Sequence, residues 1–379
     1  MKAEHQFGCA IIGGGLGGLC LSIALARQGH DVILFEKEKY PFHKVCGEYI
    51  SMESWDYLSS LGLPLKDMQL PIIQKLVVTA PDGNQLNHAL PLGGFGISRY
   101  TIDDALKEIA VQSGVTVMEG CKVDEAVFES EVFHISTSQG NFKSLCCTGS
   151  FGKRSNLDVK WKRPFVQRLP NKLNNFIAVK YHVQSNAPGD TIWLHNFKNG
   201  YCGFSKIEEG KFCLCYLTNA STLKECNNSI EQMEKKVLSQ NPHLRDIFAN
   251  CKKLYDLPLS ISQISFEQKK AVENNLLMIG DAAGLITPLC GNGMSMAIHA
   301  SKIASSYISD FLKRKISRAE MEISYAAEWK KMFGKRLQAG RFIQRFFGKI
   351  WVTNLFIQTM KLFPWLTDAI IKKTHGKKF

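Results

Sequence analysis

The sequence predicts an α/β fold, α+β overall, with a Rossmann-like nucleotide-binding domain, an antiparallel β-sheet domain and C-terminal helices. Three observations predict it. A glycine-rich strand–turn–helix unit opens the chain, strand-like runs separated by turns fill its middle, and a basic amphipathic stretch ends it. With 379 residues, 45% of them hydrophobic, the chain can form two or three domains around a sizeable core.

The first element is the segment "FGCAIIGGGLGGLCLSIALARQGHDVILFEKE". Residues 7–12 form a short apolar strand, Gly13-x-Gly15-x-x-Gly18 follows, and a helical run leads to a second strand that ends at Glu36. This order of strand, glycine turn, helix, strand and acid is the dinucleotide-binding fingerprint in its usual context. The alternative is a glycine-rich loop beside a core helix.

Each fingerprint residue has a physical reason to be there. Gly13 permits a tight turn, Gly15 lets the backbone approach a pyrophosphate, and Gly18 lets the helix pack closely on the strand. Glu36 can accept hydrogen bonds from both ribose hydroxyls. Because a carboxylate repels a 2′-phosphate, Glu36 disfavours NADP at this position and leaves FAD or NAD.

A second unusual stretch is "MIGDAAGLITPLCGNGMSMAIHA", residues 278–300. A strand-like run ends at Asp281, small residues follow, and Gly291, Asn292 and Gly293 precede a long helix. Small residues let the backbone approach a ligand, and a helix start offers unpaired N–H groups with partial positive charge. The stretch is suited to holding a flat, anionic group.

The two motifs together resemble the flavoprotein monooxygenase superfamily, which has the p-hydroxybenzoate hydroxylase fold and includes the geranylgeranyl reductases and flavin-dependent halogenases. The resemblance implies FAD as the bound cofactor and NAD(P)H as a transient reductant. In that superfamily the late Gly-Asp pair binds the ribityl chain, and the following helix points its N-terminus at the flavin pyrimidine. The implied contacts in this second stretch are Gly280, Asp281, Pro288, Gly291, Asn292, Gly293 and Met294.

Three further segments fit the resemblance. In "ISRYTIDDALKEIA", Arg99 is implied to lie on the pyrophosphate side, although a basic residue before a helix is also an ordinary structural feature. In "GCKVDEAV", the backbone of Val123 is implied to contact the adenine. Lys37, next to Glu36, is a further expected cofactor contact.

The segment "KVCGEYIS" resembles the Lys-x-Cys-Gly-Gly sequence of the geranylgeranyl reductase branch, which passes close to the isoalloxazine. Cys46 and Gly47 are therefore expected at the cofactor, with the cysteine over the flavin face. The alternative for Cys46 is a buried packing residue. Glu48 stands where the branch has its second glycine, which leaves the backbone path open at this point.

Two departures limit the resemblance. The central Asp-Gly motif of the superfamily is replaced by Phe151-Gly152, so the docking position of NAD(P)H is left open. The halogenase motif Trp-x-Trp-x-Ile-Pro is absent, and the nearest segment, "GYCGFSK", lacks its tryptophans. The sequence therefore argues against halogenation.

The domain organisation is expected to be discontinuous. An FAD-binding domain is predicted from residues 1–70, 97–160 and 270–315, a substrate-binding β-sheet domain from 71–96 and 161–269, and basic amphipathic helices from 316–379. The middle sheet would cover the reactive edge of the flavin and form the substrate wall.

The resemblance makes an FAD-dependent oxidoreductase the expected function. An NAD(P)H-dependent monooxygenase, acting on an apolar or aromatic small molecule through a flavin C4a-hydroperoxide, is the first specific hypothesis. Reduction of carbon–carbon double bonds in an isoprenoid or lipid-like substrate is the alternative, and a non-catalytic flavin-binding protein is the third. Cys46, His43 and Tyr201 are candidate catalytic residues, and no metal site is expected.

The net charge of +13 is unevenly distributed, because residues 335–379 carry ten Lys/Arg and one acid. This tail could pack on the core, cover a long apolar substrate or contact anionic lipid. No nucleic-acid motif accompanies the charge. Twelve cysteines without zinc spacing, and no spanning run or signal peptide, favour a cytoplasmic protein, with peripheral contact to the inner face of the membrane as a further expectation. The oligomeric state is left open.

Overall fold

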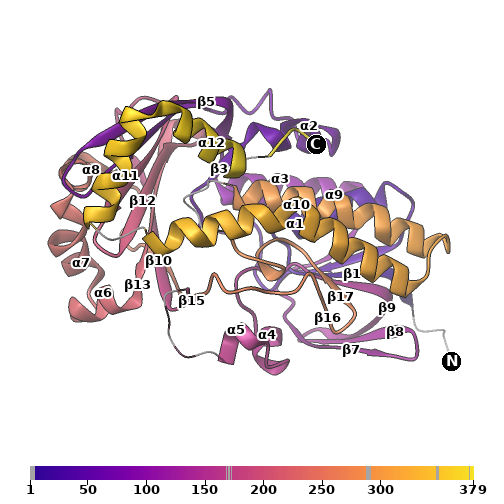
Figure 1. Ribbon diagram of the computed structural model, residues 1–379. Coiled ribbons are helices and arrows are strands. Elements are labelled where there is room, and N and C mark those ends of the chain that lie inside the picture. Colours follow the sequence, from indigo (N-terminus) through magenta and orange to yellow (C-terminus); the bar gives the residue numbers. More distant parts are fainter. Residues whose placement is uncertain are drawn as a thin grey trace.

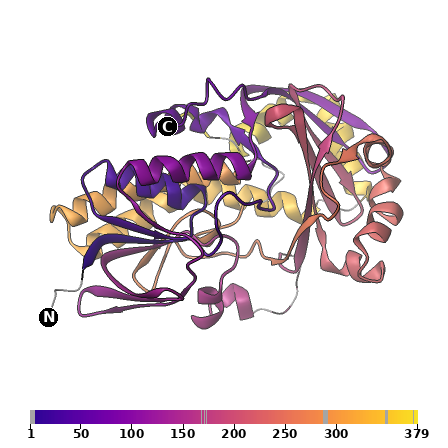
Figure 2. The same ribbon diagram turned by 180° about the vertical axis from the view of Figure 1, so that it is seen from behind.

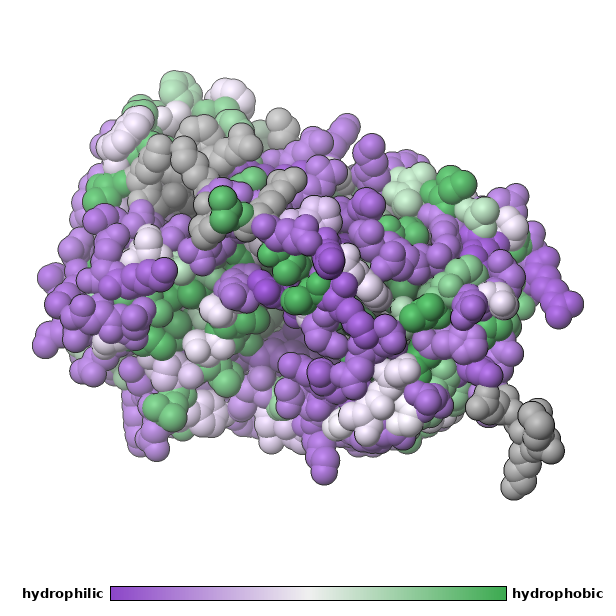
Figure 3. Space-filling view, turned by 90° about the horizontal axis from the view of Figure 1, so that it is seen from below, coloured by the Kyte–Doolittle hydropathy of each residue, from purple (hydrophilic) through white to green (hydrophobic). Residues whose placement is uncertain are grey.

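Two β-sheets lie side by side and organise the molecule (Figures 1 and 2). The computed structural model describes residues 5–167, 169, 171, 173–286, 292–346, 350–374 and 376–379. On the face seen in Figure 3, hydrophilic side chains predominate and apolar ones are scattered among them.

The first sheet contains the dinucleotide fingerprint. Its path runs β16-β17-β9-β1-β2-β6, with β7 and β8 joined to β9 at the side. The pairs β1–β2, β1–β9, β2–β6 and β9–β17 are parallel, as expected for a Rossmann-like unit. Its strands are β1 (Gln6–Ile12), β2 (Val32–Phe35), β6 (Thr116–Met118), β7 (Val123–Glu129), β8 (Val132–Thr137), β9 (Gly140–Gly149), β16 (Val272–Glu273) and β17 (Leu276–Met278).

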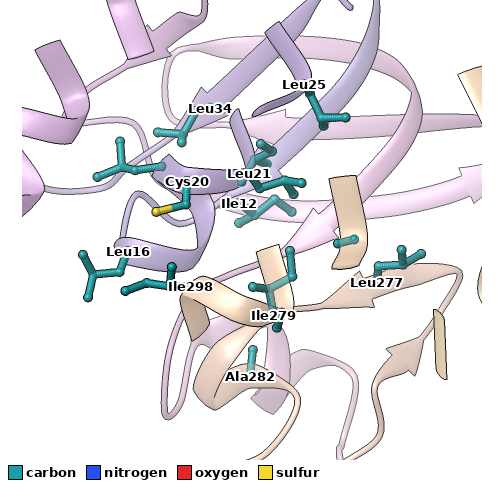
Figure 4. Close-up of a cluster of buried hydrophobic side chains, with 14 of the residues drawn as sticks. Ile12, Leu16, Cys20, Leu21, Leu25, Leu34, Leu277, Ile279, Ala282 and Ile298 are labelled. Atoms are coloured by element: carbon teal, nitrogen blue, oxygen red, sulfur yellow. The ribbon is translucent and has the colours of Figure 1, made fainter. Parts of the chain in front are cut away.

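Helices α1 (Leu16–Ala26), α3 (Arg99–Gln112) and α9 (Gly293–Leu312) cover one face of this sheet (Figure 1). Helix α1 is apolar on all sides because it is enclosed between the sheet, α3 and α9. Figure 4 shows the result: side chains from β1, α1, β2, the segment after β17 and α9 meet in one buried cluster. This packing brings the two sequence motifs together, although almost 270 residues separate them.

The second sheet follows the order β14-β10-β13-β12-β11-β4-β5-β3, with β15 paired to β10. Most pairs are antiparallel, but β4 and β11 are parallel, so the sheet is mixed rather than purely antiparallel. Its strands are β3 (Tyr49–Ser51), β4 (Ile72–Thr79), β5 (Gln85–Gly96), β10 (Phe176–Gln184), β11 (Thr191–Phe197), β12 (Gly200–Lys206), β13 (Lys211–Asn219), β14 (Lys252–Lys253) and β15 (Leu259–Ile264).

Short helices accompany the two sheets. Apolar residues of α6, α7 and α8 pack on β10, β12 and β13 in a separate core. The short elements are α2 (Trp55–Ser60), α4 (Asn156–Lys160), α5 (Pro164–Gln167), α6 (Ala220–Glu225), α7 (Ile230–Lys236), α8 (Pro242–Asn250) and the 3-10 turns η1 (Met52–Ser54), η2 (Glu208–Gly210), η3 (Leu238–Gln240) and η4 (Gly280–Ala282).

The C-terminal region is helical, as the sequence predicts, and comprises α10 (Arg318–Phe346), α11 (Ile350–Leu362) and α12 (Pro364–Thr374). Helix α10 packs on α9 and the core around the first sheet through a stripe of buried side chains spaced four residues apart, which is the spacing of one helix face. This stripe consists of Met321, Tyr325, Trp329, Phe333 and Leu337. Helix α11 packs instead on the β4–β5 hairpin. Among the described residues, no helix combines the length and apolar character needed to cross a bilayer.

Candidate functional site

The fingerprint loop joins β1 to α1 without room for side chains. Gly13 has φ of 107°, in the left-handed region that glycine tolerates. A Cβ on Gly18 would lie 2.1 Å from the Gly13 carbonyl oxygen, so any larger residue would push α1 away from β1. Gly15 caps α1 with an extended backbone, which leaves the first N–H groups of the helix available.

Glu36 lies directly after β2 and faces this loop. Its carboxylate is buried and accepts hydrogen bonds from the Gly14 N–H at 3.0 Å and the Glu38 N–H at 3.2 Å. The Lys44 ammonium lies 3.7 Å away. The neighbouring Lys37 side chain is exposed and pairs with Glu38 instead, so it does not face the loop.

Two cations, Arg99 and Lys44, also lie close to the loop. Arg99, the first residue of α3, binds Asp103 through its Nε at 2.9 Å and its Nη2 at 2.7 Å. Lys44 donates to the same carboxylate at 3.1 Å. A Cβ on Gly15 would lie 3.3 Å from the Arg99 guanidinium, so this positive charge adjoins the position where a pyrophosphate would meet the fingerprint.

The late stretch forms the opposite side of the site. Gly280 begins η4, two residues after the end of β17, and adopts φ of 62°; Asp281 follows it within η4. Asn292 and Gly293 begin α9. A Cβ on Gly293 would have Ile286 as its nearest neighbour, at 3.6 Å, so this position opens into free space. Pro288 and Gly291 lie outside the described residues.

These parts surround one cavity of about 220 Å³. Gly15, Cys46, Gly47, Asp281 and Gly293 line it from the side of the first sheet, together with Gly280, Asn292, Met294 and Arg99. The second sheet supplies a mainly apolar wall that includes Ala178, Ile192, Leu194, Tyr201, Phe204 and Leu217, together with Tyr49, Gly203, Ser205, Cys215, Tyr216 and Ile264. The cavity therefore connects the dinucleotide fingerprint to the predicted substrate sheet.

The catalytic candidates are placed differently from one another. Cys46 and Tyr201 both line the cavity, and the Cys46 sulfur lies 3.5 Å from the Met294 sulfur. His43 lies outside the residues that line it. Its ring stacks on Tyr100 with centroids 4.6 Å apart, and burial followed by the nearby Lys180 ammonium lowers the pKa of His43.

Val123 also lies outside the cavity lining. It is the buried first residue of β7, and its carbonyl accepts a hydrogen bond from the Asn156 side chain at 2.9 Å. Gly13, Gly18 and Glu36 are also absent from the lining, but they belong to or contact the fingerprint loop beside the cavity. Val123 and the exposed Lys37 are expected cofactor contacts that the structure does not bring to the cavity.

Sequence reasoning missed Glu48 as a site residue, although this charged side chain belongs to the cavity lining. It is fully buried and adopts φ of 56°, in the left-handed region that glycine tolerates more readily than a residue with a side chain. Its carboxylate accepts hydrogen bonds from the Arg99 N–H at 2.8 Å, from His182 at 2.6 Å and from the Lys180 ammonium.

Lys180 and His182 come from β10, where they are charged or titratable residues within an otherwise apolar strand, "FIAVKYHV". That pattern was the available signal: two polar side chains on the same face of a buried strand need a partner. Burial is the largest single influence on Glu48 and opposes its ionisation, but the Lys180 ammonium and His182 together outweigh it and hold the pKa of the carboxyl below its usual value.

Glu48, His182 and Cys213 also offer metal-ligand atoms within 4.8 Å of one another. The Lys180 ammonium already supplies the counter-charge to this carboxylate, and a cation would have to displace it. The geometry is therefore that of a buried ion-pair network that ties the Cys46–Gly47 segment to the second sheet.

Lys269 is a second residue that sequence reasoning missed, and it lies behind Asp281. Its ammonium donates to the Asp281 carbonyl at 2.8 Å and to the Lys153 carbonyl at 2.7 Å. Burial is the main cause that lowers the pKa of Lys269 from 10.5 to about 8. The Lys269 side chain thus holds the η4 turn in place, but it does so by burying a positive charge.

A pH-dependent stability difference follows from Lys269. Between about pH 8 and 10.5 the unfolded chain binds the proton of Lys269 more tightly than the native protein does, so its contribution to stability rises with pH. We expect the free energy of unfolding of the wild type, relative to Lys269→Met, to increase by up to about 3 kcal/mol across this range. Urea titrations of both proteins at pH 7.5 and 10 measure it; a pH-independent difference would contradict the burial of a charged Lys269.

Comparison with known proteins agrees with this architecture. Residues 11–44 match the family model described as an NAD(P)-binding Rossmann-like domain. Conditioned medium factor receptor 1 of Dictyostelium discoideum is 25% identical, over 87% of this chain and 69% of that protein. The digeranylgeranylglycerophospholipid reductase of Methanococcus vannielii is 22% identical, over 88% and 85%. The menaquinone reductase of Mycobacterium tuberculosis is 21% identical, over 81% and 78%.

Solved structures confirm the predicted fold class. The flavin-dependent brominase Bmp2 superposes with a TM-score of 0.78 at 18% identity, covering 98% of this chain and 93% of the other. PqsL of Pseudomonas aeruginosa, in complex with 2-aminobenzoylacetate, gives 0.72 at 14%, over 92% and 98%. The halogenase CmlS gives 0.75 at 18%, over 88% of this chain but 64% of its own. The resemblance stated from the sequence is confirmed: the chain has the fold of FAD-dependent monooxygenases and halogenases, and its relatives include geranylgeranyl-lipid reductases.

Proposed function

We propose that this protein is an FAD-dependent oxidoreductase that reduces carbon–carbon double bonds in an isoprenoid or other lipid-like substrate. The observation that carries the proposal is the cavity, which has a nucleotide cradle on one side and the apolar face of the second sheet on the other. An apolar wall binds hydrocarbon by removing its surface from water, and it offers a polar substrate few groups for orientation.

FAD fits the residues that are present. Glu36 would accept hydrogen bonds from the ribose, Arg99 and Lys44 would neutralise the pyrophosphate, and the start of α9 at Gly293 would face the flavin ring with its unpaired N–H groups. When bound, FAD would supply hydride transfer to and from carbon. The chain would hold the cofactor, bury the substrate and exclude water between the two sheets.

Reduction is favoured over oxygenation by the relatives that align along most of both chains. Proteins named digeranylgeranylglycerophospholipid reductase and menaquinone reductase align with more than four fifths of this chain, and the Lys44–Cys46–Gly47 segment fits that branch. Monooxygenation, the first hypothesis from the sequence, stays as the second candidate because PqsL shares the fold and binds a small ligand.

The masses of the products separate the two reactions. The FAD-loaded protein is reduced with NADPH or NADH, or with dithionite if neither works, and incubated with a polyunsaturated isoprenoid lipid. A reductase adds two hydrogens for each double bond, whereas a monooxygenase adds one oxygen atom and needs dioxygen. An oxygenated product would show that the protein is a monooxygenase, the second candidate. Unchanged substrate under all conditions would contradict the proposed activity, although the protein could still bind FAD.

A pair of neighbouring substitutions tests how FAD is held. Glu36→Ala removes the carboxylate that faces the fingerprint loop, and we expect FAD binding to weaken by about 1–3 kcal/mol. Lys37→Ala is the matched control, because its exposed side chain points away from the loop and the affinity should stay unchanged. Titration of apoprotein with FAD measures both constants. Equal affinities in the two variants would contradict the placement of the ribose at Glu36.

A further inference from the structure

The turn between α11 and α12 exposes a run of apolar side chains. Leu362 is 75% exposed, Phe363 49% and Trp365 65%, and Pro364 between them is also exposed. The turn is ordered by its backbone, since the Phe363 N–H donates to the Thr359 carbonyl at 2.9 Å. Large apolar side chains that stand together on a folded surface mark an interaction site more often than scattered ones do.

Helix α11 extends this surface. Trp351 and Leu355 lie four residues apart, one helical turn, and are 69% and 56% exposed. The opposite face of the helix packs on the β4–β5 hairpin through Ile357 and Met360 (Figure 1). The helix is therefore apolar on both faces, and within the described part of the chain only the inner face is covered.

The charge of this region indicates what covers the outer face. Residues 350–379 contain five lysines and a single acid, Asp368, which pairs with His88 at 3.0 Å. Lys361 adjoins the apolar run, and Lys372 and Lys377 are exposed farther along. Lysines beside Trp, Leu and Phe are the combination found on helices that lie in the interface of an anionic bilayer.

We propose that α11, the turn and α12 dock on an anionic lipid bilayer, with Leu362, Phe363 and Trp365 inserted at the level of the headgroups. We call these three residues the turn wedge. The exposed Lys361, Lys372 and Lys377 would contact lipid phosphates, and each adds to the attraction. This inference goes beyond the proposed function, because it is argued only from the exposed side chains and charges of this region. A membrane would also be the source of a lipid-like substrate.

A second copy of the chain is a poorer occupant for the same face. A symmetric dimer through this surface would bring two segments of net charge +4 together, which opposes association at physiological salt. An anionic bilayer supplies charge complementarity and an apolar layer at the same time.

The test uses the full-length, FAD-loaded protein with phosphatidylcholine vesicles that lack or contain phosphatidylglycerol. We expect co-sedimentation with the anionic vesicles, weak binding to the neutral ones, and a several-fold loss as salt rises and screens the lysines. Replacing the turn wedge by serine (Leu362→Ser, Phe363→Ser and Trp365→Ser together) should lower the partition coefficient at least tenfold. The matched control is Leu257→Ser with Ile323→Ser, which removes side chains 82% and 70% exposed elsewhere.

Three outcomes would overturn the proposal: no binding of the wild type to anionic vesicles, a wedge variant that binds as well as the wild type, or a wild-type dimer in sedimentation velocity that the wedge variant abolishes. Thermal unfolding should be the same in both variants, because all five replaced side chains are exposed. Vesicle binding is measured without turnover, so its failure leaves the proposed reductase activity untouched, and failure of that activity leaves vesicle binding untouched.

Discussion

Replacing Gly293 by valine should strip the protein of FAD while leaving its fold intact. The Cβ at this first residue of α9 meets nothing closer than Ile286 at 3.6 Å, so the protein itself has room for the new side chain. The side chain would project into the cavity, where the flavin ring has to approach the start of the helix. Overpacking of this kind costs about 1–3 kcal/mol, and each 1.4 kcal/mol weakens binding roughly tenfold.

The ratio of FAD to protein after gel filtration, and titration of the apoprotein, give the size of the effect. Gly334→Val is the matched control, because Gly334 is also helical, its Cβ would also meet its nearest neighbour at 3.6 Å, and it does not line the cavity. The control should retain FAD as the wild type does. Full occupancy in the Gly293 variant would show that the start of α9 does not face the cofactor.

The second large effect is expected at Glu48. Glu48→Gly relieves a positive φ, which costs a residue with a side chain roughly 1–2 kcal/mol, but leaves the buried Lys180 ammonium without its counter-charge. Because breaking one side of a buried ion pair costs about 3–5 kcal/mol, we expect a net loss of unfolding free energy. Adding Lys180→Met should recover most of it, since the unpaired charge is then gone.

Urea unfolding of the wild type, both single variants and the double variant completes a thermodynamic cycle. The control is Glu131→Gly, which relieves a φ of 64° at an exposed residue whose carboxylate, 79% exposed, pairs with Arg318 at 3.2 Å. That change should be neutral or stabilising. If Glu48→Gly changes the free energy of unfolding no more than Glu131→Gly does, the buried ion-pair network contributes little to stability.

Local spacing was sufficient to predict the parts of the site that depend on short-range backbone geometry. The fingerprint glycines, Glu36 at the end of β2 and Gly293 at the start of α9 are each defined by a turn or helix boundary within a few residues. Such boundaries restrict the local sequence directly. The cavity brings Gly15, Asp281 and Gly293 together as the resemblance implied.

Contacts between distant segments could not be read in this way. Glu48 is 132 residues from Lys180 and 134 from His182, and nothing near Glu48 in the sequence indicates this pairing. His43 is close to Cys46 in the sequence, which makes it a candidate, but it packs on Tyr100 outside the cavity lining. The parallel pairing of β4 with β11 likewise depends on how the β4–β5 hairpin packs against the rest of the second sheet. The alternation of apolar and polar residues within the hairpin does not determine it.

The central claim is that this protein, with FAD bound in the cavity, reduces a carbon–carbon double bond. One anaerobic experiment tests it most directly. The FAD-loaded protein is reduced without dioxygen and mixed with a polyunsaturated isoprenoid lipid, and both the flavin absorbance and the substrate mass are followed. The account predicts that the yellow colour returns while the substrate gains two hydrogens. A flavin that stays reduced until dioxygen is admitted, with substrate that then gains oxygen, would contradict it.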